Sequence, residues 1–152
     1  MLNILGALRS MLSLFVSRTD TWAATIEDRP GGLADKLAAL AEAGVNLEFL
    51  IARRAPEQRG NGVAFVTPLK GARQIKAAKA AGFQKTESLH SIRVEGADKP
   101  GMGAKLTRAL AEAGINLRGL SAAAIGKRYV TLLALDSAQD AAKAAAVLKK
   151  LS

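Results

Sequence analysis

The chain has 152 residues, no cysteine and a formal net charge of +9, and 49% of its residues are hydrophobic. The length suits one ordinary domain or two minimal ones, and the composition is that of a folded globular protein. The lack of cysteine excludes disulfides, thiolate metal sites and cysteine nucleophiles. The positive charge raises a polyanion as a partner, but the basic residues are scattered without a run of five, which favours a solvated basic surface.

Residues 1–19 differ from the rest, because they contain two arginines and three serines but no acidic residue. Apolar residues recur there at helical spacing from Leu5 to Phe15. The run is short and holds Arg9, which excludes a membrane span, and it lacks the charged start and cleavage site of a secretory signal. We interpret these residues as an N-terminal extension, amphipathic or dispensable, with an Arg- and Ser-rich transit peptide as the alternative.

An internal repeat organises the remainder of the chain. The segments Asp28–Leu47 and Asp98–Leu117 align without a gap at a spacing of 70 residues, and twelve of their twenty positions are identical. A match of this order indicates a duplication. We therefore predict a first domain over residues 20–88 and a second over residues 89–152.

The first copy is predicted to contain strand, helix, strand, strand, helix and strand. Pro30 is expected in the first turn of the first helix, and Gly44 just beyond its end, where positive φ is needed. This order is the ferredoxin-like βαββαβ arrangement, an α+β fold whose helices lie on one face of an antiparallel sheet. The expected strands are Trp22–Ile26, Leu47–Arg54, Val63–Thr67 and Phe83–Glu87, and the second helix is Gly71–Ala81.

The second copy repeats this order but is one strand short. Its helices are expected between Pro100 and Gly114 and over Ser137–Lys150, after which two residues remain. Its last strand is therefore missing or supplied from elsewhere, and the apolar run Leu12–Val16 is the candidate for that edge. The expected strands are Ser91–Glu95, Leu117–Ile125 and Tyr129–Leu135.

Both copies carry a motif that identifies a family resemblance. The segment Glu27–Leu33 (EDRPGGL), followed by Ala41–Leu47 (AEAGVNL), resembles the ACT-domain signature, in which Pro-Gly opens the first helix and Gly-β-branched-Asn opens the second strand. Asp98–Gly101 (DKPG) with Gly114–Leu117 (GINL) matches it again. The resemblance covers residues 22–150 and is to stand-alone tandem ACT proteins. It implies regulation by a small ligand, typically an amino acid, bound where two ACT units meet.

The resemblance assigns ligand contact to the turn before the first helix and to the Asn of the second strand. A helix N-terminus offers N–H groups and partial positive charge to a carboxylate, the glycines let the backbone approach closely, and an aspartate suits an ammonium. The candidate ligand-binding residues are Asp28, Arg29, Pro30, Gly31, Gly32, Leu33, Asn46, Asp98, Lys99, Pro100, Gly101, Met102 and Asn116.

Structural roles are the alternative for each of these residues. The aspartates can cap helices, the prolines can simply start them, and the asparagines can adopt left-handed geometry or cap a strand. The two loops also differ, since Gly96-Ala97 replaces Ile26-Glu27, so that one copy can be structural only.

Catalytic motifs are missing from the sequence. His90 is the only histidine, and no nucleophile elbow, P-loop or dinucleotide fingerprint occurs. We expect no enzyme activity, cofactor or metal, a cytoplasmic location, a homodimer, and an unidentified regulated enzyme as a further partner. The alternative is a basic ferredoxin-like nucleic-acid-binding or adaptor module. In Arg59–Val66, however, the positions where RNA-binding sheets carry stacking aromatics hold Asn61, Val63 and Val66.

Overall fold

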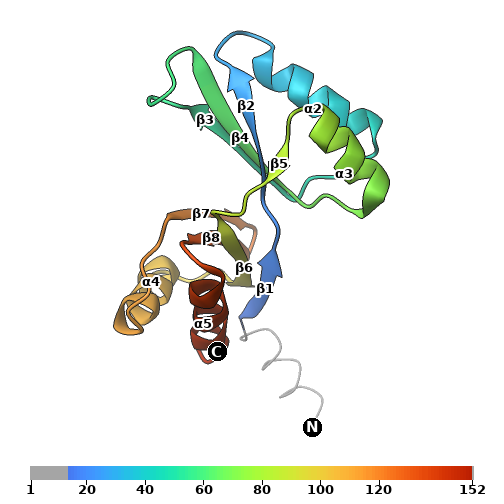
Figure 1. Cartoon of the computed structure of the whole chain (residues 1–152). Helices are drawn as coiled ribbons and strands as arrows, with labels where there is room; N and C mark the ends of the chain where they lie inside the picture. The colour runs from blue at the N-terminus through green and yellow to red at the C-terminus, as the bar shows by residue number, and fades with distance from the viewer. Residues whose placement is uncertain (1–13, 152) are drawn as a thin grey trace, which may run out of the picture. The chain divides into compact units, whose positions relative to one another are not determined.

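The computed structural model describes residues 14–151, which form two compact α+β units (Figure 1). The first unit comprises residues 20–87, and the second combines residues 14–19 with residues 88–151. Each unit has one antiparallel sheet of four strands and two helices. The prediction of two ferredoxin-like α+β units in tandem is confirmed.

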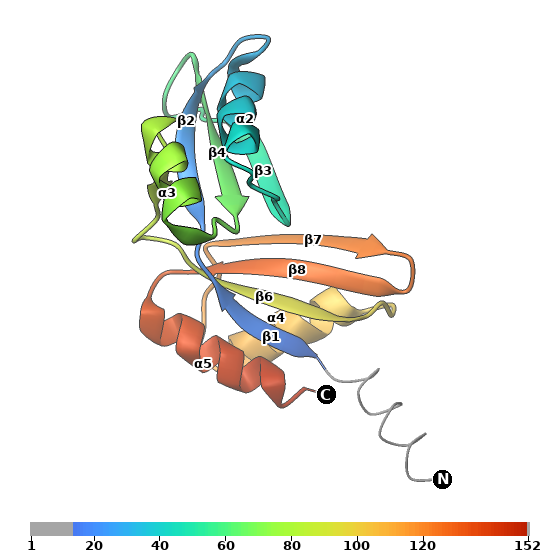
Figure 2. The same ribbon diagram turned by 90° about the vertical axis from the view of Figure 1, so that its right-hand side faces the viewer.

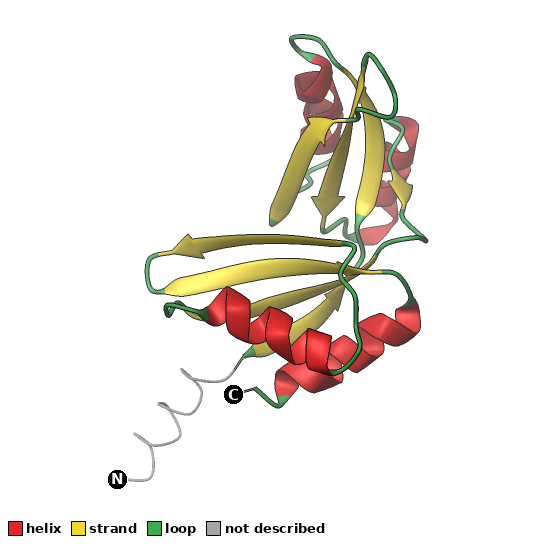
Figure 3. Ribbon diagram, turned by 90° about the vertical axis from the view of Figure 1, so that its left-hand side faces the viewer, coloured by secondary structure: helices red, strands yellow, loops and turns green. Residues whose placement is uncertain are grey.

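The first unit follows the predicted order of elements. Both helices lie on the same face of its sheet (Figure 3), and the strand order is β3-β4-β2-β5. Its elements are β2 (Trp22–Glu27), α2 (Gly32–Glu42), β3 (Phe49–Arg54), β4 (Asn61–Thr67), α3 (Gly71–Ala80) and β5 (Gln84–Lys85).

The second unit has the strand order β1-β6-β8-β7, which Figure 2 shows from β7 to β1 with both helices on one face. Its elements are β1 (Phe15–Thr19), β6 (His90–Ala97), α4 (Met102–Glu112), β7 (Gly119–Ile125), β8 (Arg128–Leu135) and α5 (Ala138–Lys149). No strand follows α5 within residues 14–151, as predicted.

Strand β1 closes the edge that the second copy leaves open. It pairs antiparallel with β6, with Val16 opposite Val94, and thus lies where β5 lies beside β2 in the first unit. The sequence placed this strand at Leu12–Val16, whereas the structure has it at Phe15–Thr19. Residues assigned above to an extension are therefore part of the second sheet, because they complete its backbone hydrogen bonding. Residues 1–13 lie outside the described part of the chain.

Alternation along the strands decides which side chains enter each core. On β2, Trp22, Ala24 and Ile26 face the helices and are at most 9% exposed, and they pack with Leu40 of α2 and Phe83. The second core consists of aliphatic side chains and Tyr129, and it includes Val16 of β1. Each core is thus enclosed between one sheet face and its two helices.

The turn before each first helix depends on a glycine with left-handed geometry. Gly31 has φ of 86° and Gly101 has φ of 84°, which side chains rarely tolerate. Pro30 and Pro100 were expected in the first helical turn, but the helices begin two residues later. The prolines therefore shape the turn, and the glycines occupy the N-cap positions.

Because Val16 belongs to the second core, we expect Val16→Ala to lower the free energy of unfolding by about 1–3 kcal/mol. Phe15→Ala is the matched control, because the Phe15 side chain is 65% exposed on the same strand, and it should change stability by less than about 0.5 kcal/mol. Urea denaturation measures both variants. Equal losses in the two variants would contradict the placement of β1 in the sheet.

Candidate functional site

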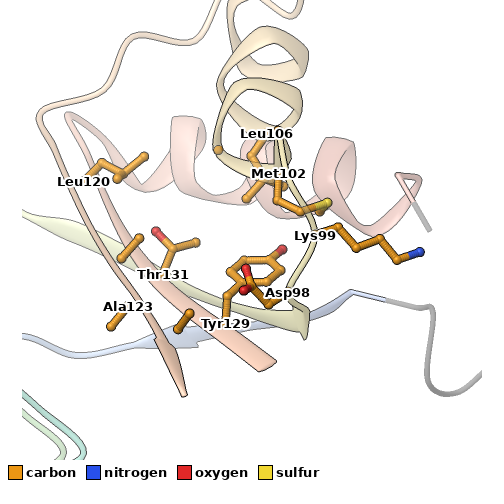
Figure 4. Close-up of a pocket in the computed structure, with 12 residues that line it drawn as sticks. Asp98, Lys99, Met102, Leu106, Leu120, Ala123, Tyr129 and Thr131 are labelled. Carbon is orange, nitrogen blue, oxygen red and sulfur yellow. The ribbon is translucent and has the colours of Figure 1, made fainter. Parts of the chain in front are cut away.

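Each unit has a pocket between the turn that precedes its first helix and the adjacent hairpin. The pocket of the second unit has a volume of about 280 Å³, and that of the first about 220 Å³. Residues of the second pocket (Figure 4) are Asp98, Lys99, Gly101, Met102, Gly103, Leu106, Leu120, Ala122, Ala123, Ala124, Tyr129 and Thr131. Residues of the first are Ile26, Glu27, Asp28, Arg29, Leu33, Ala52, Arg53, Arg54 and Gly62.

The two pockets occupy equivalent places in the duplicated fold. Asp28 and Arg29 in the first correspond to Asp98 and Lys99 in the second at the spacing of 70 residues. The segment 52–54 of β3 likewise corresponds to residues 122–124 of β7. The duplication therefore produced two versions of one site, and their differences are informative.

In the first pocket the charged groups neutralise one another. The Arg54 Nε lies 3.0 Å from Asp28 Oδ2. The Arg29 guanidinium contacts the Glu27 carboxylate and lies 2.8 Å from Asp35 Oδ2, and these hydrogen bonds raise the pKa of Arg29. A polar ligand entering here would have to compete with ion pairs that the chain makes itself.

The second pocket has the same two charged positions without those partners. The places of Arg54 and Glu27 are taken by Ala124 and Ala97, and that of Asp35 by a lysine. Within residues 14–151, the Asp98 carboxylate and the Lys99 ammonium make no hydrogen bond or ion pair. The Asp98 carboxylate is therefore available at this pocket, and the Lys99 side chain extends from the same turn away from the other lining residues (Figure 4).

A single cross-strand pair forms the floor of each pocket, with the large and small residues exchanged. In the first unit Ile26 pairs with Gly62, and a Cβ on the glycine would lie 2.9 Å from the Ile26 side chain. In the second unit Gly96 pairs with Tyr129, and a Cβ on that glycine would lie 3.0 Å from the ring. At this place an aliphatic side chain lines the first pocket and Tyr129 lines the second, with its hydroxyl oxygen buried.

The hydroxyl of Tyr129 is a buried polar group without a partner. The residue is 8% exposed, and the hydroxyl has no hydrogen-bond partner within the described structure. In Figure 4 the ring lies beneath the start of α4 and its hydroxyl points toward the helix. Burial raises the pKa of Tyr129, so the phenol is neutral at physiological pH.

The other walls of the second pocket combine apolar side chains with the start of α4. Thr131 supplies a second hydroxyl, which donates to the Ser121 carbonyl oxygen at 2.9 Å and keeps lone pairs free to accept. Met102 and Leu120 provide apolar surface. The first turn of an α-helix has N–H groups without intrahelical acceptors, and three residues of this turn line the pocket.

The structure brings only part of the predicted set together. Asp28, Arg29 and Leu33 line the first pocket, and Asp98, Lys99, Gly101 and Met102 line the second, whereas the prolines line neither. Gly31 is an N-cap, and Gly32 is packed so closely that a Cβ would lie 2.2 Å from the Glu27 carbonyl oxygen.

Several structural alternatives are wrong. No side-chain cap hydrogen bond occurs at the start of α2 or α4, so neither aspartate caps its helix. No residue other than glycine has positive φ within residues 14–151, so Asn46 and Asn116 are not in left-handed geometry. Both asparagines are exposed and follow the far end of the helix, outside the pocket of their own unit.

Sequence reasoning missed the hairpin side of both pockets. Tyr129 and Thr131 face the helices from β8, and Ala122 and Ala124 face them from β7. The sequence signal that could have located these residues is the alternation of facing along a strand, in which every second residue points to the same side. At the strand ends nearest the turn, this alternation places Tyr129, Thr131 and their neighbours under the start of the helix.

The comparisons with known proteins agree with the geometry. The family model of the ACT domain matches residues 24–81 and again residues 90–152. The chain therefore belongs to the ACT-domain family, with two such domains in tandem. None of the curated proteins compared with this chain matches it in sequence.

Solved structures with the same fold include regulatory subunits of enzymes. The chain is similar to a protein of Bacteroides thetaiotaomicron, with TM-score 0.73, 18% identity and coverage of 89% of each chain. It is also similar to the regulatory subunit of aspartate kinase from Thermus thermophilus, with TM-score 0.64 and 20% identity over 92% of this chain and 97% of the other. The regulatory subunit from Thermus flavus gives TM-score 0.60 and 19% identity over the same shares.

Residues 14–151 contain no cluster of three or more His, Asp or Glu side chains that could hold a metal ion. The helices in that range include none with the length and hydropathy needed to cross a membrane.

Because Tyr129 lies over Gly96, we expect Gly96→Ala to lower the free energy of unfolding by about 1–3 kcal/mol through overpacking. Gly103→Ala is the matched control, since a Cβ there has nothing within 4 Å and the position is helical. It should raise stability by about 0.5–1 kcal/mol. Chemical denaturation measures both, and a neutral Gly96→Ala would contradict the close contact with the ring.

The raised pKa of Tyr129 predicts a specific loss of stability in alkali. Unfolded tyrosine ionises near the model value of 10.0, whereas the buried phenol stays neutral to higher pH, so unfolding releases a proton and the free energy of unfolding falls as pH rises above about 10. Tyr129→Phe should lose this component but behave in parallel with the wild type between pH 6 and 9. Melting temperatures measured across pH 6–11 test this, and parallel curves above pH 10 would contradict it.

Proposed function

We propose that this protein is a non-catalytic regulator that binds a free amino acid in the pocket of its second ACT domain. The observation that supports this most directly is the pair of unpartnered charges, Asp98 and Lys99, beside the first turn of α4. A free amino acid carries the complementary pair, an ammonium and a carboxylate, on one carbon atom. The volume of about 280 Å³ suits a ligand smaller than a drug-sized molecule.

Each part of the ligand has a defined counterpart in this proposal. The Asp98 carboxylate accepts hydrogen bonds from the ammonium. Lys99 and the N–H groups at the start of α4 donate to the carboxylate, which the helix dipole also stabilises. The ligand side chain then enters the space between Met102 and Leu120, where apolar surface is available.

The first ACT domain has a different role in the proposal. Its Asp28 is held by Arg54, and its Arg29 by two carboxylates. These exposed pairs contribute little to stability, but they compete directly with a zwitterion for the same groups. We therefore assign the principal ligand site to the second domain and a structural role to the first.

A dimer would bring the asparagines to the site. Strand β7 is an edge strand that runs from the Asn116 end of the unit toward the pocket. Within one unit, Asn116 lies outside the pocket. If β7 pairs antiparallel with β7 of a second chain, the partner's Asn116 reaches this pocket. Leu120, which is 44% exposed on this edge, would be covered at the same time. Ligand binding would thus alter a contact between chains and, through it, the activity of an enzyme.

A thermal-shift experiment against the twenty amino acids at millimolar concentration tests the proposed function. A ligand at 100 times its dissociation constant stabilises a protein by about 2.7 kcal/mol, which moves the melting temperature by several degrees. We expect Asp98→Asn to abolish this shift. The matched control, Asp28→Asn, should preserve it, because Asp28 is the equivalent residue of the first domain.

The two possible failures of this experiment have different meanings. No shift with any amino acid would overturn amino-acid binding as the function. A shift that Asp28→Asn removes and Asp98→Asn retains would instead reassign the site to the first domain.

A further inference from the structure

We infer that the second pocket selects an amino acid with an aliphatic side chain, and that Gly103 determines this specificity because its missing side chain leaves room for the ligand. This inference rests on the proposed function and specifies its ligand class. Gly103 lies in the first turn of α4 and lines the pocket together with Asp98 of the preceding turn.

The fold itself does not require a glycine at position 103. Glycine is needed where φ is positive or where another group approaches the backbone closely. Gly103 is not among the glycines with positive φ, and a Cβ added to it would have nothing within 4 Å. Glycine is also less favourable in a helix than most other residues. What this glycine provides is open space beside the pocket.

The first domain shows what a side chain does at this position. Leu33 is the equivalent residue at the spacing of 70, and it lines the first pocket and packs against the core of its unit. The pocket with the leucine has a volume of about 220 Å³, and the pocket with the glycine one of about 280 Å³. A large side chain at position 103 would therefore take up space in the second pocket.

The surface that a ligand side chain would meet in this space is apolar. Leu120 is 44% exposed, and Ala122 and Ala124 are exposed beside it on β7. Met102 of α4 lies across the pocket from Leu120 (Figure 4). An aliphatic ligand side chain placed here removes apolar surface of both partners from water, which favours binding.

The two hydroxyls of the lining are not accessible to a polar ligand side chain. The Tyr129 oxygen is buried, and Thr131 is 2% exposed and donates its proton to the Ser121 carbonyl oxygen. A polar group placed between α4 and β7 would lose hydrogen bonds to water without replacing them. The pocket therefore favours an aliphatic side chain over a polar one of the same shape.

The test measures pairs of amino acids of nearly equal shape by titration calorimetry on the full chain. Valine is compared with threonine, and leucine with asparagine. We expect the wild type to bind the apolar member of at least one pair about tenfold or more tightly than the polar member. Gly103→Leu, which introduces the residue of the first domain, should weaken binding of the preferred amino acid by about tenfold or more, because the two side chains compete for one space.

The matched control is Ala104→Leu, which adds the same side chain at the next position of α4, where it is exposed and outside the pocket lining. Its affinity should stay within about threefold of the wild type. The melting temperature of ligand-free Gly103→Leu is measured in parallel and should not fall, because leucine is more favourable in a helix than glycine. A fall would contradict the open space at Gly103.

The outcomes separate this inference from the proposed function. If amino acids bind but the polar members bind as tightly as the apolar ones, the ligand class is overturned while amino-acid binding stands. Tightest binding of glycine, alanine or an amino acid with a charged side chain has the same meaning, and unchanged binding in Gly103→Leu overturns the role of Gly103. If no amino acid binds, the proposed function fails, and this inference fails with it.

Discussion

The pairing of β1 with β6 is the constraint on which the second domain depends. Two helices need a sheet of about four strands beneath them, and residues 88–151 provide only three. Without β1, the backbone groups of β6 would form an open edge and Val16 would be missing from the core. The pocket lies over β7 and β8 in the same sheet, so its geometry depends on a strand that comes from before the first domain.

Because the domain is duplicated, the pocket of one copy can be closed by ion pairs of the chain itself while the pocket of the other copy keeps a free carboxylate. Both copies retain the glycine turn that starts the first helix and the aspartate beside it. In the first copy Arg54 pairs with Asp28 and Glu27 pairs with Arg29, whereas the second copy has alanines at the positions of Arg54 and Glu27. The same fold therefore has charged groups that pair with each other in the first domain and charged groups without such partners in the second.

Local sequence signals determined the fold well and the site only in part. Gly44 was expected to have positive φ, and its φ is 76°, with 71° at the equivalent Gly114, because the geometry of a helix end depends mainly on neighbouring residues. The sequence placed β1 three residues too early, because the strand's position is set by pairing with β6, which is distant in sequence. The turn aspartates were predicted from a motif. Tyr129 was not predicted, because its place beside the pocket follows from the pairing of β8 with β6, in which it lies opposite Gly96.

The order of the strands also has a consequence for synthesis on the ribosome. Strand β1 is made before the whole first domain, and its partner β6 begins at His90. At about 5–20 residues per second, β1 therefore waits for several seconds or more before it can pair. During that time the first domain can complete its own sheet, since all four of its strands lie within residues 20–87. The domain that can complete its sheet first is thus enclosed in the sequence of the other domain.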